Sequence, residues 1–315
     1  MTGREQAKHP ISSLPARGKQ PATKKALHLW IRDASEKTGV PQRRLNTLVA
    51  NSVVLAILQT SKDTKGPRFL LKGGTGIEIR LALKARASAD LDTMFRGEFK
   101  DWLGHLDQVL SNPFPPFTFK RDEPEEIPIQ TRVVKPYRVK IKLELNGSVA
   151  LATQLEVAPD EAGAGDSMEF LTLPNLEHLG INLVENIAVL ILDYQVAQKI
   201  HAVTDPHNPP NSRNDRAHDL IDLLLIRNAF YSQSSQDQLR GLKTAAVKLF
   251  EARATEANKL GLQPRTWPPS IQIPEHWENG YRAARLEIGQ DEGNLPAEVY
   301  EAVELITEWI SEINS

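Results

Sequence analysis

Residues 69–95 read FLLKGGTGIEIRLALKARASADLDTMF, and this stretch decides the fold of the chain. A short apolar strand leads into Gly73-Gly74-Thr75, after which a helix is predicted to about Leu83. A second strand is expected over residues 90–95, where Asp90 and Asp92 alternate with apolar neighbours. The order of strand, glycine turn, helix and strand predicts a mixed α+β fold.

The glycine turn is a candidate phosphate site. Free backbone N–H groups and the positive end of the helix face outward at such a turn, and a triphosphate fits there. Gly-Gly turns between a strand and a helix are also common for steric reasons alone. Gly73, Gly74 and Thr75 are therefore candidate nucleotide-binding residues that need support from a second motif.

Asp90 and Asp92 supply that second motif. Residues two apart on a strand point to the same side, so the two carboxylates repel each other unless cations bridge them. Oxygen ligands suit Mg²⁺ or Mn²⁺, and a pair of such ions would neutralise a triphosphate while activating an attacking hydroxyl. A solvated strand edge is the alternative for an isolated D-x-D. The preceding Gly-Gly-Thr turn favours the metal site.

A third carboxylate, Glu144, lies on the clearest strand of the chain. Over residues 138–145, RVKIKLEL, apolar and polar residues alternate, so Lys142 and Glu144 share the polar face. We expect Glu144 to join Asp90 and Asp92 as a metal ligand, with Lys142 beside it and well placed to contact phosphate. A solvated Lys-Glu ladder is the other interpretation. The enzyme interpretation depends on Glu144 lying beside the two aspartates.

Lys199 interrupts the buried stripe of a helix predicted over residues 194–203, so its ammonium group needs a partner. On the next predicted helix Arg216, Asp219 and Asp222 are spaced three apart, and either aspartate can pair with Lys199. Such a pair is either a structural salt bridge between two helices or part of a site that binds phosphate or transfers a proton.

Composition limits the class of protein. The 315 residues include no cysteine, which excludes disulfides, thiolate metal sites and cysteine nucleophiles. Neither an H-E-x-x-H nor a G-x-S-x-G motif is present, so zinc and serine hydrolases have little support. No apolar run is long enough to span a membrane and the first residues do not form a secretory signal, so we expect a cytoplasmic protein without a membrane partner.

Charge is distributed unevenly along the chain. Residues 1–150 contain 26 Lys and Arg against 15 Asp and Glu, a net charge of +11, whereas the remainder carries −13. A polyanionic partner is therefore expected to meet the N-terminal part. The alternative is that the charges only solvate two surfaces.

Three parts are expected along the chain. Residues 1–24 are polar and have no hydrophobic period, which predicts a flexible basic arm. Residues 25–190 contain the strands and most of the motifs, and residues 191–315 are predicted to form a helical lobe. A small, acidic stretch over residues 158–168 indicates a loop or linker.

The order of these motifs resembles that of the AbiEii/AbiGii nucleotidyltransferase toxins, a family with MenT-like members, over about residues 40–310. The matching motifs are Gly73-Gly74-Thr75, Arg86-Ala-Ser88-Ala-Asp90-Leu-Asp92, Lys142-Leu-Glu144, Lys199-Ile-His-Ala202 and Arg216-Ala-His-Asp219-Leu-Ile-Asp222. Three features depart from the family: Gly76 replaces the usual alanine, Glu144 is the longer carboxylate, and residues 158–180 look like an insertion.

The resemblance implies a polymerase-β-like nucleotidyltransferase lobe joined to a mainly α-helical C-terminal lobe. It implies a toxin of a bacterial toxin–antitoxin or phage-defence pair, with a cognate antitoxin protein as partner. The MenT-type toxins add pyrimidine nucleotides to the 3′ end of tRNA. By this resemblance the chain is expected to transfer a nucleoside monophosphate from an NTP to an RNA 3′ end, with tRNA as the acceptor, and so to block translation.

The resemblance also implies roles for the residues. Asp90, Asp92 and Glu144 would hold Mg²⁺, with action as a base the alternative for Glu144. Lys199 would contact the triphosphate, and Asp219 would orient Lys199 or the incoming hydroxyl. The nucleotide-binding set implied is Gly73, Gly74, Thr75, Ser88, Lys142, Arg216 and Asp222.

Two other classes of function stay open from the sequence. One is an NTP-dependent transferase that modifies a protein. The other is a catalytically silent module that binds NTP, RNA or an antitoxin. The sequence does not identify the transferred base, the RNA, the antitoxin or the oligomeric state.

Overall fold

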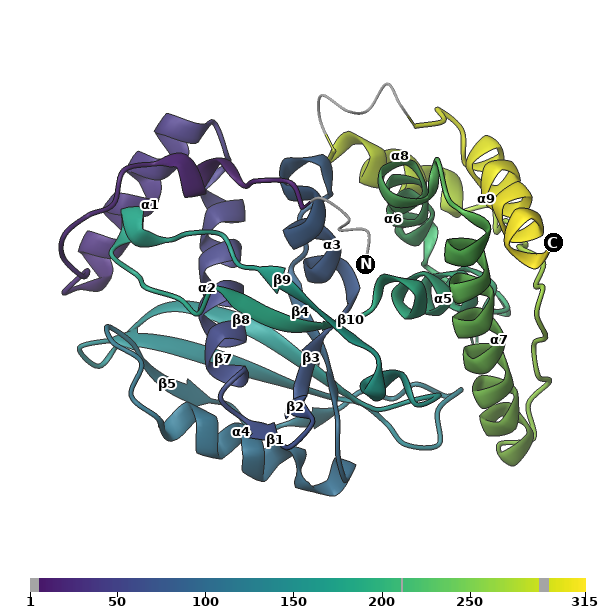
Figure 1. Ribbon diagram of the computed structural model, residues 1–315, viewed down its shortest axis with the longest axis horizontal. Coiled ribbons are helices and arrows are strands. Elements are labelled where there is room, and N and C mark those ends of the chain that lie inside the picture. Colours follow the sequence, from purple (N-terminus) through teal and green to yellow (C-terminus); the bar gives the residue numbers. More distant parts are fainter. Residues whose placement is uncertain (1–5, 211, 289–294) are drawn as a thin grey trace.

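The strand, turn, helix and strand expected around the glycines are all present in the computed structural model, which describes residues 6–210, 212–288 and 295–315 (Figure 1). They are β3 (Phe69–Leu71), α3 (Gly73–Leu81) and β4 (Asp90–Phe95). A short 3₁₀ turn, Ala82–Lys84, follows α3. β3 and β4 pair antiparallel, so the start of α3 and the start of β4 lie at the same edge of the sheet.

These strands are part of a mixed eight-stranded sheet with the order β5-β7-β8-β4-β3-β10-β9, in which β6 also pairs with β7. The pairs β4–β8 and β3–β10 are parallel, and the other pairs are antiparallel. The remaining strands are β5 (Thr118–Arg121), β6 (Glu125–Glu126), β7 (Tyr137–Leu145), β8 (Ser148–Pro159), β9 (Met168–Thr172) and β10 (Asn186–Leu190), with β1 (Lys62–Asp63) and β2 (Gly66–Pro67) in a separate hairpin.

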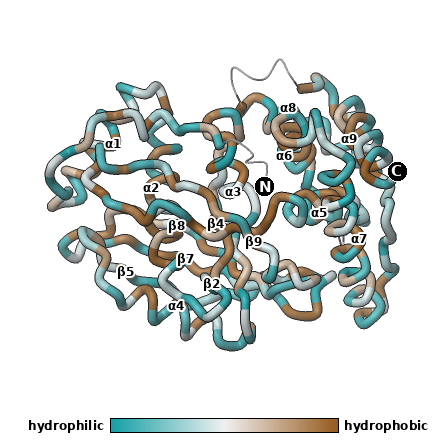
Figure 2. Tube along the Cα trace, in the orientation of Figure 1, coloured by the Kyte–Doolittle hydropathy of each residue, from teal (hydrophilic) through white to brown (hydrophobic). Residues whose placement is uncertain are grey.

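Helices α1 (Lys24–Thr38), α2 (Gln42–Leu58) and α4 (Trp102–Ser111) pack against this sheet. The first two helices are separated at Gly39, which ends α1 in the left-handed conformation at φ +71°. The apolar stripes of these helices and the inward side chains of the strands form one continuous core (Figure 2). Short 3₁₀ helices lie at Pro10–Ser13, Phe99–Asp101, Ala164–Asp166 and Glu177–Leu179.

The C-terminal part is helical, as predicted. It consists of α5 (Leu192–Val203), α6 (Ala217–Ile226), a π-helical turn (Arg227–Tyr231), α7 (Gln236–Lys259), α8 (Trp277–Leu286) and α9 (Val299–Asn314). Its core surrounds Trp277 and Trp309 and also includes Ile77 and Leu81 of α3, so α3 contributes side chains to both lobes. In the ranges that the structure covers, no helix combines the length and the apolar character of a membrane span.

The structure corrects the prediction of a free N-terminal arm. Residues 6–23 do not form a free arm: Ile11 is 1% exposed, and Gln6 exchanges hydrogen bonds with the backbone of Thr172. Buried Ile11 and His9 and the side-chain hydrogen bonds of Gln6 and Arg17 hold this polar segment, and hydrophobic periodicity does not reveal such contacts. The loop expected over residues 158–168 is present: residues 160–167 connect β8, which ends at Pro159, to β9, which begins at Met168. Residues 1–5 of the expected arm lie outside the described residues.

Glu161 lies two residues after the end of β8 and joins two lobes. The β lobe is the large sheet with the helices packed on it, and the helical lobe is the C-terminal part that begins with α5. Its carboxylate accepts hydrogen bonds from Arg132 of the β lobe at 2.8 Å and from Arg253 of α7 at 2.7 and 3.0 Å, and Gln198 of α5 donates at 2.7 Å. Burial alone would raise the pKa of Glu161, but Arg253 and Arg132 lower it to about 2. The charge is therefore retained at the lobe junction.

This junction predicts an acid-sensitive stability. Because the pKa of Glu161 is about 2 in the folded protein and its ordinary value is 4.5, its contribution is complete above pH 4.5 and is lost as the pH falls towards 2. The shift corresponds to about 3 kcal/mol. Glu161→Gln should lower the free energy of unfolding at pH 7 and flatten its decline below pH 5, measured by urea denaturation. If the free energy of unfolding falls as steeply below pH 5 in Glu161→Gln as in the wild type, the lowered pKa does not belong to Glu161.

Candidate active site

Three carboxylates share one face of two neighbouring parallel strands. Asp90 and Asp92 lie two residues apart on β4, and Asp92 stands in register beside Glu156 of β8. Cross-strand neighbours project to the same face of a sheet, so Glu156 faces the same side as the aspartate pair. Arg138 of β7, the next strand, donates to Glu156 at 3.0 and 2.5 Å and balances one of the three charges.

The crowding of these carboxylates raises pKa values. Burial and then the neighbouring charge of Asp92 raise the pKa of Asp90. The same two causes, burial and Asp92, raise the pKa of Glu156, although Arg138 opposes them. The ionised forms of Asp90 and Glu156 are therefore disfavoured, as expected in a cluster that a cation would stabilise.

The expectation that Glu144 joins Asp90 and Asp92 is wrong. β7 and β8 run antiparallel, so Glu144 pairs with Val149 near the hairpin turn, whereas Glu156 lies near the other end of β8. Glu144 is buried and accepts a hydrogen bond from Lys120 at 3.0 Å.

Lys142 is likewise separate from the two aspartates. It stands opposite Ala152 on β8, and its ammonium group is paired with Asp122. The predicted Lys142–Glu144 contribution to the site is therefore replaced by Arg138 and Glu156, which come from the opposite ends of the same two strands.

The glycine turn lies directly against the carboxylates. Gly73 has φ +67°, and an added Cβ would stand 2.1 Å from Oδ2 of Asp92. At Gly74 an added Cβ would come within 2.8 Å of Ser88 Oγ and 3.4 Å of Arg86 Nη2. Because both positions lack a side chain, the first turn of α3 approaches β4 closely enough for its backbone N–H groups and the carboxylates to meet one ligand.

Two hydroxyl groups fix the main chain of Asp90. Thr75 donates to the Asp90 carbonyl oxygen at 2.8 Å, and Ser88 donates to the same oxygen at 3.2 Å. Both residues were predicted to bind nucleotide; in the structure their hydroxyls hold the start of β4. The backbone N–H of Ser88 in turn donates to Glu78 of α3 at 3.0 Å, and Arg44 of α2 pairs with the other Glu78 oxygen at 2.7 Å.

The predicted pairing of Lys199 with an aspartate is confirmed for both candidates. Its ammonium group donates to Asp219 at 2.5 Å and to Asp222 at 2.8 Å, and Arg86 forms a bidentate pair with Asp222 at 3.0 and 2.9 Å. Burial alone would lower the pKa of Lys199, but the two aspartates outweigh it and raise the pKa. The two cations balance the two anions, and within the described part of the chain two of the three ammonium N–H groups have an acceptor.

Arg86 connects the two halves of the site. It precedes β4, lies beside Gly74, and reaches across to Asp222 of the helical lobe. Arg216 is more peripheral: its guanidinium is 54% exposed and lies 3.8 Å from Asp219. The glycine turn, the carboxylates and the Lys199 pair thus form one connected arrangement.

The donor set fits a divalent cation shared with a substrate. Magnesium takes oxygen ligands and is commonly held by one or two carboxylates together with substrate phosphates. Asp90 and Asp92 supply such carboxylates, and Glu156 adds a third beside them. Among the described residues, no three His, Cys, Asp or Glu side chains converge tightly enough to hold a metal by themselves, so phosphate oxygens would complete the coordination.

One protein-family model matches the sequence. It describes the AbiEii nucleotidyl transferase toxins, of type IV toxin–antitoxin systems, and it matches residues 56–304. The chain belongs to this family. The match includes the glycine turn, the carboxylates on β4 and β8, and the Lys199 pair, so the protein is a nucleotidyltransferase toxin by family.

Among solved structures, the chain is similar to MenT4, a nucleotidyltransferase toxin from Mycobacterium tuberculosis H37Rv. The two share 17% identity and a TM-score of 0.50, over 92% of this chain and 97% of MenT4. An antigenic nucleotidyltransferase-like protein from Paracoccidioides brasiliensis shares 13% identity and a TM-score of 0.34, over 70% of this chain and 93% of its own. The first likeness confirms the α+β nucleotidyltransferase fold. A search of curated proteins finds no match.

Glu156 and Arg138 were missed by sequence reasoning although a signal existed. Asn146-Gly147 is the strongest short-range indication of a hairpin, and both residues have positive φ in the turn, +48° and +77°. A second strand after this turn would have been expected, with Thr153, Leu155 and Val157 on its apolar face. Glu156 then falls on the polar face beside β4.

The contact between Gly73 and Asp92 gives a prediction. Gly73→Ala adds a Cβ at a strained φ and pushes the Asp92 carboxylate away, so nucleotidyl transfer should fall at least about 100-fold, as expected for displacement of a catalytic group. Gly261→Ala is the matched control, since Gly261 has φ +68° and nothing within 4 Å of an added Cβ. Both variants should lose similar stability by thermal unfolding. Equal activity in the two would show that the Gly73 contact is unimportant.

Proposed function

We propose that this nucleotidyltransferase toxin uses Mg²⁺ to transfer a nucleoside monophosphate from an NTP to the 3′ end of an RNA, with tRNA as the acceptor, and thereby blocks translation. The observation that carries the proposal is the convergence of Asp90, Asp92 and Glu156 beside the glycine turn at Gly73. Carboxylates held this close together suit a site in which divalent cations neutralise both the carboxylates and the phosphates of a substrate.

Backbone N–H groups and the Lys199 side chain bind the phosphates. The backbone N–H groups at Gly74 and Thr75 face the triphosphate at the positive end of α3. Lys199, kept charged by Asp219 and Asp222, offers its remaining N–H to a phosphate oxygen. When bound, the divalent cation supplies charge neutralisation for the phosphates.

The transfer itself is an in-line displacement. The RNA 3′-hydroxyl oxygen forms a bond to the α-phosphorus as the bond to the β-phosphate oxygen breaks, and pyrophosphate leaves. Glu156, whose pKa is raised by burial and by Asp92, is placed to receive the hydroxyl proton. Asp90 and Asp92 keep the reacting groups aligned.

Removal of a central carboxylate tests the proposal. Asp92→Ala should abolish transfer of label from α-³²P-NTP to total tRNA and should also remove growth inhibition in cells, with Asp122→Ala on an exposed loop as the control. Digestion of labelled products with RNase or protease identifies the acceptor. Full toxicity of Asp92→Ala, or a label that resists RNase and yields to protease, would rule out RNA transfer by this site.

A comparison of the two glutamates tests the third carboxylate. Glu156→Gln should reduce turnover by about 100-fold or more, in the range of a lost general base, whereas Glu144→Gln should leave turnover within about threefold. Initial rates at saturating NTP, together with thermal unfolding of both variants, provide the measurement. A larger loss of turnover in Glu144→Gln than in Glu156→Gln would assign the third catalytic carboxylate to Glu144 instead.

A further inference from the structure

Lys72, the residue before the glycine turn, continues the pairing of β3 with β4. Its backbone is extended, with φ −141° and ψ −169°, and its N–H donates to the carbonyl oxygen of Asp92 at 2.9 Å. The register of the two strands, in which Leu71 stands opposite Thr93, therefore places Lys72 opposite Asp92. Cross-strand neighbours project to the same face of a sheet, so the Lys72 side chain leaves β3 on the face of Asp92 and Glu156.

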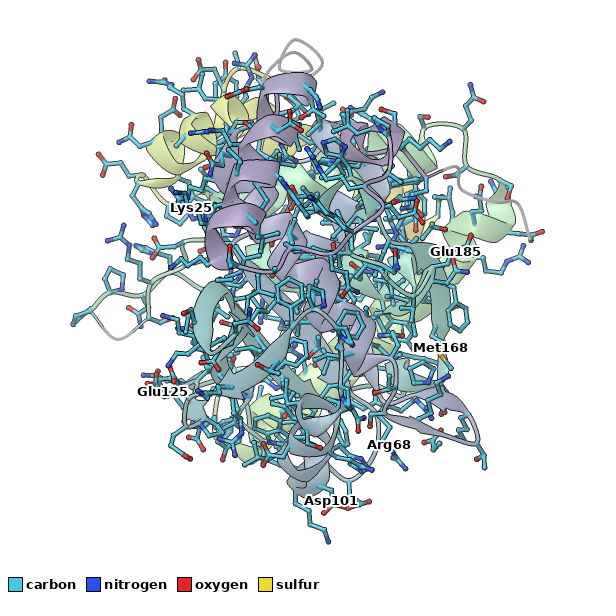
Figure 3. The ribbon with its side chains drawn as sticks, turned by 90° about the vertical axis from the view of Figure 1, so that its left-hand side faces the viewer. Lys25, Arg68, Asp101, Glu125, Met168 and Glu185 are labelled. Carbon is cyan, nitrogen blue, oxygen red and sulfur yellow. The ribbon has the colours of Figure 1, made fainter. Side chains whose placement is uncertain are left out.

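Four charged residues thus form one row across four adjacent strands. Their order is Arg138 on β7, Glu156 on β8, Asp92 on β4 and Lys72 at the end of β3. Figure 3 labels Glu125 of β6 and Met168 of β9, which lie on the two sides of the sheet between which the row runs. The two carboxylates in the middle of the row are therefore flanked by one cation on each side.

Lys72 differs from Arg138 in having no partner. Arg138 donates to Glu156, whereas the Lys72 ammonium group, although only partly exposed, forms neither an ion pair nor a hydrogen bond within the described ranges. Its charge acts on Glu161, whose pKa is raised by burial and lowered by Arg253, by Arg132 and less strongly by Lys72. Three other side chains already donate to that carboxylate, so a further cation beside it indicates another anion.

The place of Lys72 in α3 suits a bound phosphate. Lys72 is the N-cap of this helix, a position that normally carries a side chain able to accept a hydrogen bond from the first turn, and here no such bond is present. The free N–H groups of α3 and the Lys72 side chain therefore start at the same point. Gln198, which donates to Glu161, is followed on α5 by Lys199, so a polyphosphate at this helix end lies between two lysines from different lobes.

The row also has the order that an in-line displacement requires. The attacking and the leaving oxygens stand on opposite sides of the phosphorus in such a reaction. Glu156, assigned to receive the proton of the attacking hydroxyl, lies on one side of Asp92, and Lys72 lies on the other. A leaving group that departs away from Glu156 therefore moves towards Lys72.

We propose that Lys72 is a further catalytic residue, which binds the β- and γ-phosphates of the NTP and neutralises the pyrophosphate as it leaves. The inference rests on the proposed function, because it gives a direction to the same displacement. As the 3′-oxygen bonds to the α-phosphorus and its proton passes to Glu156, the electron pair of the broken bond stays on pyrophosphate. The Lys72 ammonium group stabilises this added charge without giving up a proton. Support of Glu161 at the lobe junction is the competing role.

The test compares two lysines on the same face of the sheet in the full chain. Lys72→Met removes the charge and keeps the length of the side chain. Lys140→Met is the matched control, since Lys140 is exposed, stands opposite Gln154 and has no ion pair among the described residues. Calorimetry in the presence of Mg²⁺ measures the affinity for inorganic pyrophosphate and for nucleoside monophosphates, and label transfer at saturating NTP measures turnover.

A selective loss is expected for Lys72→Met. It should bind pyrophosphate roughly tenfold more weakly, as for one lost charge-assisted hydrogen bond, and bind the monophosphate as the wild type does. Turnover should fall about 100-fold, in the range of a lost donor to a developing charge. Lys72→Arg, which keeps the charge, should recover most of the pyrophosphate affinity, and Lys140→Met should match the wild type in both affinities.

The other outcomes overturn the assignment. They are unchanged pyrophosphate affinity in Lys72→Met, an equal loss in Lys140→Met, or no pyrophosphate binding by the wild type. A lower melting temperature with equal weakening of pyrophosphate and monophosphate would show that Lys72 only supports Glu161. Label transfer to RNA by the wild type in any of these cases leaves the proposed function standing. Selective loss of pyrophosphate affinity in Lys72→Met, with no labelling of RNA by the wild type, would remove RNA transfer and keep the phosphate contact.

Discussion

Repulsion among Asp90, Asp92 and Glu156 is the constraint on which the rest of the structure depends. The register between β4 and β8 places Glu156 beside Asp92, and the pKa values of Asp90 and Glu156 are raised as a result. Such crowding opposes folding in the absence of a cation. The surrounding contacts offset it: Arg138 pairs with Glu156, and hydroxyl groups hold the Asp90 main chain from two sides.

Buried charge is also what joins the lobes. Arg86 of the β lobe and Lys199 of the helical lobe together neutralise Asp222 and Asp219, and Glu161 is neutralised by guanidinium groups from both lobes. An unpaired buried ion costs several kcal/mol. Separation of the lobes would take Arg86 away from Asp222 and Arg253 away from Glu161, so these pairs hold Lys199 at a fixed place relative to the carboxylates.

Local pattern predicted most of the fold and the part of the site that lies close in sequence. The Gly73 turn and β4 follow from turn chemistry and alternation, and the buried position of Lys199 requires an acidic partner, which Asp219 and Asp222 of the next helix supply. The Asn146-Gly147 hairpin indicates a strand with Glu156 on its polar face, but local pattern does not place Glu156 beside Asp92, because that neighbourhood is set by strand order and register across 64 residues of sequence. Glu144 has the same residue type and face pattern, but the antiparallel hairpin carries it to the far end of the sheet.

The electrostatics of the site also explain why a charged surface is needed elsewhere. A carboxylate cluster repels an RNA 3′ end as well as a triphosphate, so the contacts that make the chemistry possible oppose binding of the substrate. Cations and Lys199 can offset this for the nucleotide, which lies within the site. A long polyanion gains more from many weak phosphate contacts spread over a distant surface.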